Sequence, residues 1–465
     1  MRFLVTCISL LSFCLVALSA QARQPNVIIF YTDDQGTLDV NCFGSKDLIT
    51  PHFDKLAADG VRFTQAYAHT VCCPSRAALI TGCHPQRSNV NSWTQGRLHG
   101  AMGRNLALEE TTMAEALKGA GYSTALFGKW HIGAHKDHGP LKQGFDEFFG
   151  NRSGFIDNYD HFGGHGIGSH DLFEGTKEVF HRGVYYPDLI VDRALGFMER
   201  NQDKPFFLYF GFNLPHYPEQ PVGPYANAYE DMEEPRRSYA RVVSTCDHYL
   251  GRLMGGLEKL KLTDDTIVIF TSDNGHSEED YQVKVDNHMA GRPRGENYGA
   301  NGGGGNTGKW IGAKGSFLEG GLRVPAIMSY PNGLPKGQVR DQAVTIMDWY
   351  PTVLDLCGVD RPRGVKFDGR SVLPFVKDSS AKSEHEQLYW QWQKGWVVRD
   401  GDWKLITNGG YGLGQPKLPA NPYLANPSDT EPESKNYASE KPEIVKRLQG
   451  LYDEWAKDVF SVYPP

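Results

Sequence analysis

Short apolar runs that end in acidic or polar loops are the feature that most limits the fold of this chain. Residues 26–31 are rich in β-branched side chains and lead into Thr32-Asp33-Asp34-Gln35-Gly36; residues 266–270 lead likewise into Thr271-Ser272-Asp273-Asn274-Gly275. Such runs are typical of strands that are buried on both faces of a parallel sheet. Because helical patterns separate them along the chain, the sequence predicts an α/β fold.

Further elements fit this alternation. Residues 112–118 predict a helix that ends before Gly119, residues 123–127 predict a strand, and residues 188–199 predict a helix before a strand at 205–210. Near residue 384 the pattern changes to short strands at hairpin spacing, followed by a helix. We therefore expect a large mixed, mainly parallel sheet flanked by helices, and a smaller C-terminal α+β subdomain with an antiparallel sheet. We expect three parts: an N-terminal segment at 1–22, a main domain at 23–380 and the C-terminal subdomain at 381–465. The expected C-terminal elements are strands at 388–392, 395–398 and 403–406 and a helix at 442–457.

The first 22 residues have the layout of a secretory signal peptide. Arg2 precedes an apolar run over residues 3–18, and small residues follow at 19–22. A membrane anchor is the alternative, but the run is shorter than the roughly 20 residues that span a bilayer. A lipoprotein at Cys14 stays open, although Ser12-Phe13 is a poor context for lipid attachment. We expect export to the periplasm or the medium and no stable membrane insertion.

Charge and cysteine content exclude two other classes. The chain has 48 Lys and Arg against 55 Asp and Glu, a formal net charge of −7. Nucleic-acid-binding proteins usually carry a basic stripe, so we expect no nucleic-acid partner. An anionic substrate would need a local basic pocket. The cysteines that remain after residue 22 are too sparse to form a disulfide framework.

Polar residues that follow the predicted strands are the first candidates for chemistry. Reactive groups in parallel sheets lie on loops beyond the carboxyl ends of the strands. Each acidic pair alone is also an ordinary turn sequence, and an isolated Lys or His at a strand end is usually just solvated. The residues in such positions are Asp33, Asp34, Lys129, His131, His216, Asp273 and Asn274.

Residues 71–82 contain the most informative motif. Pro74 suits a first helical turn and Gly82 suits a helix end, so Cys72 is expected at a helix N-terminus, where backbone donors favour negative charge. Taken alone, Cys72 fits either a reactive thiol or a structural pair with Cys73.

Cys72-Cys73-Pro74-Ser75-Arg76 and the trailing Leu79-Ile80-Thr81-Gly82 resemble the signature of the type I sulfatases, members of the alkaline-phosphatase-like superfamily. The resemblance implies that Cys72 is oxidised to formylglycine by a formylglycine-generating or other sulfatase-maturing enzyme. The hydrate of that aldehyde offers one oxygen to attack sulfur and a second to expel the sulfate. The later segments 368–371 and 398–404 also look like the family's, whereas the region near Leu424 departs from it.

The same resemblance implies the roles of the remaining site residues. One Ca²⁺ would be bound by Asp33, Asp34, Asp273, Asn274 and the modified Cys72, since a hard cation takes oxygen ligands. The implied catalytic set is Arg76 beside the metal, Lys129 and His131 at the sulfate and formylglycine, and His216 and Lys314 on the leaving-group side. Asp273 is also a candidate to accept the proton of the attacking hydroxyl.

Weaker candidates lie on loops. Ser153 is a possible sulfate contact, although a surface-loop serine is the plainer interpretation. His276, Glu278, Glu279 and His288 could select a sugar, or be solvated loop residues. Residues 303–309 have phosphate-loop spacing, but Trp310 stands where Ser or Thr should bind magnesium, and no strand precedes them, so we reject that motif.

We therefore expect an exported sulfatase, with a sulfated carbohydrate as the substrate because sugars stack on aromatic side chains, which form 12% of this chain. A phosphonate or phosphodiester hydrolase of the same superfamily is one alternative. Phosphatase relatives generally use Thr or Ser with two metals, and no second ligand set is evident. A non-catalytic protein that binds sulfated glycans is the other alternative, should Cys72 stay unmodified.

Overall fold

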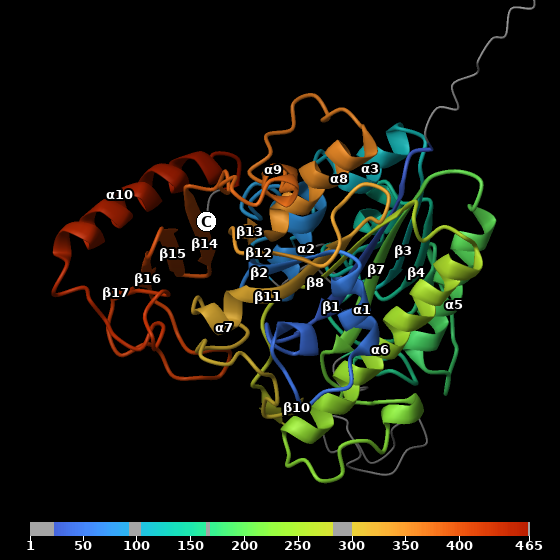
Figure 1. The fold of residues 1–465 in the computed structure, drawn as a ribbon, viewed down its shortest axis with the longest axis horizontal. Helices are drawn as coiled ribbons and strands as arrows, with labels where there is room; N and C mark the ends of the chain where they lie inside the picture. The colour runs from blue at the N-terminus through green and yellow to red at the C-terminus, as the bar shows by residue number, and fades with distance from the viewer. Residues whose placement is uncertain (1–22, 93–103, 164–167, 282–299, 464–465) are drawn as a thin grey trace, which may run out of the picture.

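A large mixed sheet forms the centre of the molecule (Figure 1). The computed structural model describes residues 23–92, 104–163, 168–281 and 300–463. Strand order in the described part is β12-β2-β11-β8-β1-β7-β3-β4-β5-β6, with β13 also pairing with β2. The strands are β1 (Asn26–Asp33), β2 (Val61–Tyr67), β3 (Ser123–Gly128), β4 (Glu147–Gly150), β5 (Phe173–Glu174), β6 (Lys177–Glu178), β7 (Phe206–Pro215), β8 (Thr266–Ser272), β11 (Arg323–Ser329), β12 (Gln338–Arg340) and β13 (Val344–Thr345).

The central strands are parallel, as the sequence predicts. β1 pairs in parallel with β7 on one side and β8 on the other, and β3 pairs in parallel with β7 and β4. β11 runs antiparallel between β8 and β2, which makes the sheet mixed. The expected fold class, a mainly parallel sheet flanked by helices, is confirmed.

Helices cover both faces of the sheet, which explains why all eight residues of β1 are buried. Alternate residues of β1 enter two cores: Val27 and Ile29 pack on one side, Ile28 and Phe30 on the other. The first side is covered by α2 (Cys72–Thr81), α3 (Met113–Gly119), α8 (Trp349–Cys357) and α9 (Leu373–Lys377). The second side is covered by α1 (Pro51–Ala58), α5 (Tyr186–Arg200) and α6 (Arg236–Lys259).

Helix α3 and strand β7 lie where the sequence predicts them, but their ends differ from the predicted ones. The predicted helix at 112–118 is α3; Thr112 caps it, because its side chain accepts from the Glu115 N–H while Glu115 accepts from the Thr112 N–H. The predicted strand at 205–210 is β7, but it continues to Pro215, where it pairs with Asp33 across an irregularity in register. His216 therefore follows the strand directly and does not lie on a separate loop.

The C-terminal residues form a separate four-stranded antiparallel sheet, also as predicted. Its strands are β14 (Gln387–Trp392), β15 (Gly395–Asp400), β16 (Trp403–Thr407) and β17 (Tyr423–Ala425), and α10 (Pro442–Val459) covers it. The region near Leu424, where the sequence departs from the family pattern, still forms the edge strand β17 and pairs with β16.

Two smaller elements and the cysteines complete the described chain. β9 (Asp280–Tyr281) pairs with β10 (Ala300–Asn301), and α7 (Glu319–Leu322) precedes β11. None of the six cysteines in the described ranges forms a disulfide. None of the helices seen there has both the length and the apolar composition needed to span a bilayer. The predicted signal peptide at residues 1–22 lies outside the described residues.

A buried ion-pair network joins the two sheets. The Lys404 ammonium is fully buried, 2.9 Å from Glu319 Oε1 and 2.8 Å from Glu433 Oε1. Arg323 also binds Glu319, at 2.7 Å. Glu319 belongs to α7 beside the large sheet, whereas Lys404 lies in β16 of the small one, so this network fastens the C-terminal sheet to the large sheet.

Replacement of Lys404 by Met should lower the free energy of unfolding by about 3–5 kcal/mol, because it leaves buried carboxylates without their shared cation. Urea unfolding measures this change. The matched control is Lys446→Met on the exposed side of α10, with an expected change below about 0.5 kcal/mol. Equal stability of the two variants would contradict the role given to this network.

Candidate active site

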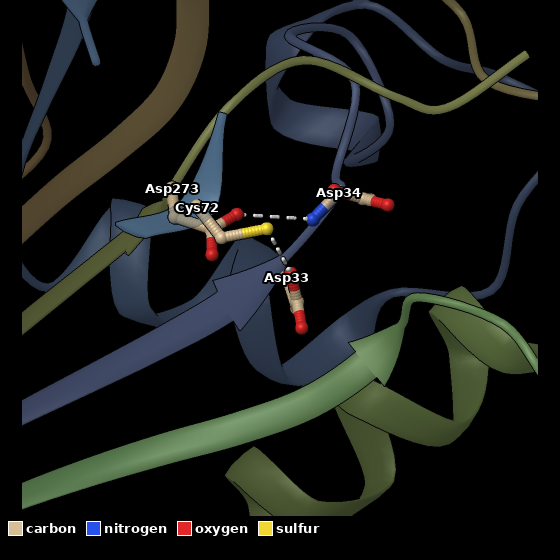
Figure 2. A group of neighbouring side chains, drawn as sticks. All are labelled: Asp33, Asp34, Cys72 and Asp273. Carbon is tan, nitrogen blue, oxygen red and sulfur yellow. Dashed lines mark hydrogen bonds between the residues drawn. The ribbon is translucent and has the colours of Figure 1, made fainter. Parts of the chain in front are cut away.

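The site begins where β1 and β8 end side by side. Their register runs from Asn26 opposite Thr266 to Thr32 opposite Ser272, so the acidic pairs that follow both strands emerge together. Asp34 has a φ of 63°, a left-handed conformation that turns the chain sharply after β1. Its backbone N–H donates to Asp273 Oδ1 at 3.2 Å. Asp33, Asp34 and Asp273, here called the aspartate cluster, are all buried (Figure 2).

Cys72 completes this group. It is the first residue of α2, as the sequence predicts, and Gly82 ends that helix with a φ of 67°. Its thiol lies 3.5 Å from Asp33 Oδ1. One ligand atom from Cys72 and one from each member of the aspartate cluster lie within 4.8 Å of one another. Residues from three distant parts of the chain thus converge on one point.

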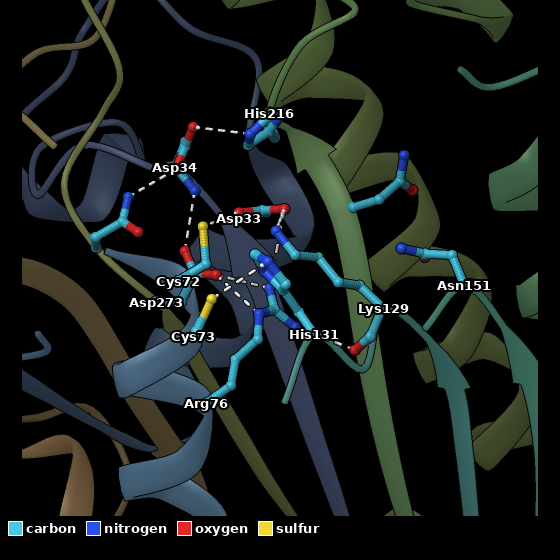
Figure 3. A network of polar contacts seen from close by, with 12 residues as sticks. Asp33, Asp34, Cys72, Cys73, Arg76, Lys129, His131, Asn151, His216 and Asp273 are labelled. Atoms are coloured by element: carbon cyan, nitrogen blue, oxygen red, sulfur yellow. Dashed lines mark hydrogen bonds and ion pairs between the residues drawn. The ribbon is translucent and has the colours of Figure 1, made fainter. Parts of the chain in front are cut away.

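Three cationic side chains contact the aspartate cluster, and Figure 3 shows two of them, Lys129 and Arg76. The Lys129 ammonium lies 2.5 Å from Asp33 Oδ2, and the Lys314 ammonium lies 2.8 Å from Asp34 Oδ2. Arg76 donates from Nε at 2.9 Å and from Nη2 at 2.7 Å to Asp273 Oδ2. Each aspartate therefore has its own cationic partner.

The pKa values of the aspartates show how far these cations compensate for burial. Burial opposes ionisation of Asp33, but Lys129 and the neighbouring cations hold its pKa well below the usual range. Burial and the nearby carboxylates raise the pKa of Asp34 and Asp273 despite their partners, Lys314 and Arg76. Asp34 and Asp273 are therefore harder to ionise here than in water, although each has a cationic partner.

Asn274 offers an unused oxygen at the same point. Its amide nitrogen donates to Asp34 Oδ1 at 2.6 Å and to the Gly275 carbonyl at 2.8 Å. Its Oδ1 is buried and has no hydrogen-bond partner among the described residues. A buried amide oxygen without a partner is rare in folded proteins. Together with three carboxylates it forms an oxygen-rich set suited to a hard divalent cation.

The two histidines lie differently from each other. His216 Nδ1 is 2.7 Å from the Tyr217 carbonyl, so Nδ1 donates and Nε2 faces Asp34 Oδ2 at 3.6 Å. Burial, with the charge of Lys314, lowers the pKa of His216 to about 4. His131 Nε2 lies 3.2 Å from Cys73 Sγ, so this ring contacts the second cysteine of the motif. Burial and the Lys129 charge lower the pKa of His131 well below its ordinary value.

The weaker sequence candidates divide between the site and other structure. The Ser153 backbone N–H donates to Asp171 Oδ2 at 2.7 Å, and its hydroxyl contacts the same atom, so this serine is bound to Asp171. His276 is buried, and its carbonyl accepts from the Lys314 N–H at 2.9 Å. His276 Nε2 lies 3.7 Å from Glu278. His288 lies outside the described residues.

Two further residues, Glu279 and Tyr217, lie beside Lys314 and His216. Glu279 Oε2 accepts from the Tyr217 hydroxyl at 3.1 Å and lies 3.8 Å from the Lys314 ammonium. Both line a small cavity together with Asp34 and His216. The sequence marked Glu279 as a loop candidate, but it gave no sign of Tyr217 beyond its position next to His216.

Comparisons with known proteins agree with this geometry. A sequence model of the sulfatase family matches residues 25–359. Human steryl-sulfatase is 30% identical over 82% of this chain and 74% of its own, and pig N-acetylgalactosamine-6-sulfatase is 29% identical over 80% and 73%. The solved structure of Ps i-CgsB in complex with k-i-k-neocarrahexaose is 27% identical, covers 93% of both chains and has a TM-score of 0.78.

Replacement of Arg76 by Met tests the electrostatic balance of the site. It keeps the buried volume but leaves Asp273 without its cation, so we expect a loss of about 3–5 kcal/mol in metal-free protein. Urea unfolding in the presence of a chelator measures it, with the exposed Arg361→Met as the control. A change no larger than in the control would show that Arg76 does not hold Asp273.

Proposed function

Because this chain belongs to the sulfatase family and is a sulfuric ester hydrolase, we propose that it cleaves a sulfate ester of a carbohydrate with a formylglycine made from Cys72. The observation that carries the proposal is the meeting of Cys72 with the aspartate cluster and with Lys129, Lys314 and Arg76. The Cys72 sulfur of the unmodified chain marks the position that an oxygen of the hydrated aldehyde would take in the active form.

A single calcium ion suits the oxygen donors of the site. The proposed ligands are the aspartate cluster, the unpartnered Asn274 Oδ1 and the oxygen that replaces the Cys72 sulfur. The raised pKa values of Asp34 and Asp273 support this assignment, because a divalent cation would relieve the repulsion between the carboxylates. A bound calcium supplies Lewis-acid stabilisation of negative charge on oxygen.

The cationic side chains are proposed to bind the sulfate group. With calcium present, the aspartates no longer need all of the positive charge of Lys129 and Lys314, which are then available to an anionic ligand. Lys129 lies with Asp33, near Cys72, and is assigned to the sulfate beside the nucleophile. His131 is assigned to the same side, and Arg76 supports the cluster through Asp273.

His216 and Lys314 are proposed to act on the leaving group. Both lie at Asp34, within 3.6 Å and 2.8 Å of its Oδ2. The hydrogen bond from Nδ1 to the Tyr217 carbonyl fixes the His216 ring so that Nε2 faces the site. A bound anionic sulfate favours the protonated imidazole, which can then deliver a proton to the departing alkoxide.

Carbohydrate is the proposed substrate class. Ps i-CgsB was solved with k-i-k-neocarrahexaose, and one mammalian relative is an N-acetylgalactosamine-6-sulfatase. The predicted signal peptide supports export to the periplasm or the medium, where sulfated polysaccharides are met. The proposed partners are a sulfated carbohydrate and a sulfatase-maturing enzyme.

Cys72→Ala should abolish hydrolysis of an aryl sulfate, by at least about 10³-fold, because it removes the nucleophile. Cys73→Ser, at the neighbouring position, should keep most of the activity. Peptide mass analysis should show CHO in place of CH₂–SH at residue 72 and an unchanged residue 73. Faster turnover of an aryl phosphate than of an aryl sulfate would favour phosphoryl transfer, and an unmodified Cys72 in a protein that binds sulfated glycans without turnover would favour a binding role.

Calcium should stabilise the protein by about 2.7 kcal/mol at a concentration 100 times its dissociation constant. Thermal unfolding with calcium and with a chelator measures this difference. Asn274→Ala should reduce it, because the variant removes an uncharged oxygen ligand, whereas Asn227→Ala on an exposed loop should not. An equal calcium effect in both variants would remove Asn274 from the ligand set.

A further inference from the structure

A groove beside β2 carries charge opposite to that of the whole chain. The formal net charge is −7, yet four cationic side chains and one carboxylate line this groove among the described residues. β2, the loop before α7 and the C-terminal sheet all contribute to it. These charged residues are Arg62, Lys309, Arg323, Arg399 and Asp402.

Two of the cations are available to a ligand. Neither Arg62 nor Lys309 forms an ion pair with a carboxylate in the part of the chain that the structure describes, and Lys309 is exposed. Arg323 is neutralised by Glu319 at 2.7 Å, whereas Asp402 accepts a hydrogen bond from Ser428 at 2.7 Å. The groove therefore presents unpaired positive charge to solvent.

Two more features bring the cations together and add an aromatic surface. Arg323 and Arg399 both donate to the Tyr67 hydroxyl, so their like charges are held side by side. The half-buried Trp310 ring also lines the groove, with the Arg323 guanidinium 4.0 Å and the Lys309 ammonium 4.8 Å from its centre. Cations beside an aromatic ring are suited to a sugar that carries an anionic substituent.

The walls of the groove continue into the active-site loops. Thr37 and Leu38 line the groove and lie three and four residues after Asp34, while Lys309 and Trp310 lie five and four residues before Lys314. The two walls are tied together, because the Leu38 N–H donates to the Asn306 carbonyl at 3.0 Å. Parts of both walls of the groove therefore belong to the loops that also carry Asp34 and Lys314.

We propose that this groove is a subsite for a second anionic group, a sulfate or carboxylate, on the carbohydrate chain whose sulfate ester is cleaved. The proposal rests on the function proposed above and adds a preference for substrates with several anionic groups. Arg62 and Lys309 bind the second anion, and Trp310 contacts its sugar ring.

The test compares Arg62→Gln/Lys309→Gln with the charge-matched control Arg361→Gln/Lys446→Gln, whose sites are exposed and outside the groove. Calorimetry on the full-length Cys72→Ala chain measures binding of multiply sulfated hexasaccharides from carrageenan, chondroitin and heparin. The groove variant should bind the preferred hexasaccharide at least about tenfold more weakly, since it loses two charged contacts, and the control should bind it like the parent. With rising salt concentration, the parent's affinity for the hexasaccharide should also fall more steeply than the affinity of the groove variant.

A second arm separates this proposal from the proposed function. In matured protein, kcat/KM for a monosulfated aryl ester should stay within about twofold in the groove variant, because that ester has no second anionic group for the groove to bind. Equal hexasaccharide affinity in the groove variant and the control, or no binding by the parent, would overturn the subsite. Equal binding of a desulfated hexasaccharide would overturn its anionic character. Absence of aryl sulfate turnover by the matured parent would overturn the proposed function and leave the binding result standing.

Discussion

Three carboxylates buried together at the ends of two neighbouring strands set the terms for the rest of this structure. Because β1 and β8 pair in register, Asp33, Asp34 and Asp273 lie close together at the ends of these strands. Buried charges of one sign are stable only where opposite charges or a metal ion meet them. The positions of Lys129 at the end of β3, Arg76 on α2 and further side chains from more remote loops follow from this requirement.

Lys314 shows how the C-terminal subdomain takes part in the site. The Ala313 N–H donates to the Tyr411 carbonyl at 2.9 Å, and the Leu413 N–H donates to the Lys314 carbonyl at 2.8 Å. The loop between β16 and β17 thus holds the backbone on which this lysine stands. The buried pair of Glu319 and Lys404 fixes the same segment a few residues later. The small sheet acts as a support for one wall of the site.

The sequence predicts those helices and strands whose formation depends mainly on neighbouring residues. Residue type and spacing alone predict the strands β1 and β8, the helix that starts at Cys72 and the C-terminal hairpins. Long-range pairing cannot be predicted in this way. Nothing in residues 206–215 shows that β7 continues opposite Asp33, and nothing in β11 shows that it runs antiparallel between two parallel strands. The contact of His131 with Cys73 likewise depends on a backbone turn with a φ of 61°.

The small cavity beside His216 and the groove beside β2 differ in charge. Glu279, bonded to Tyr217 and 3.8 Å from Lys314, places a carboxylate on the wall of the cavity next to His216. A second sulfate on that side would meet like charge, which disfavours such a pose. In the groove beside β2, Arg62 and Lys309 offer positive charge that no carboxylate among the described residues neutralises. Under the proposed function, a polyanionic chain meets repulsion at Glu279 and attraction in the groove beside β2, although the protein as a whole carries a net negative charge.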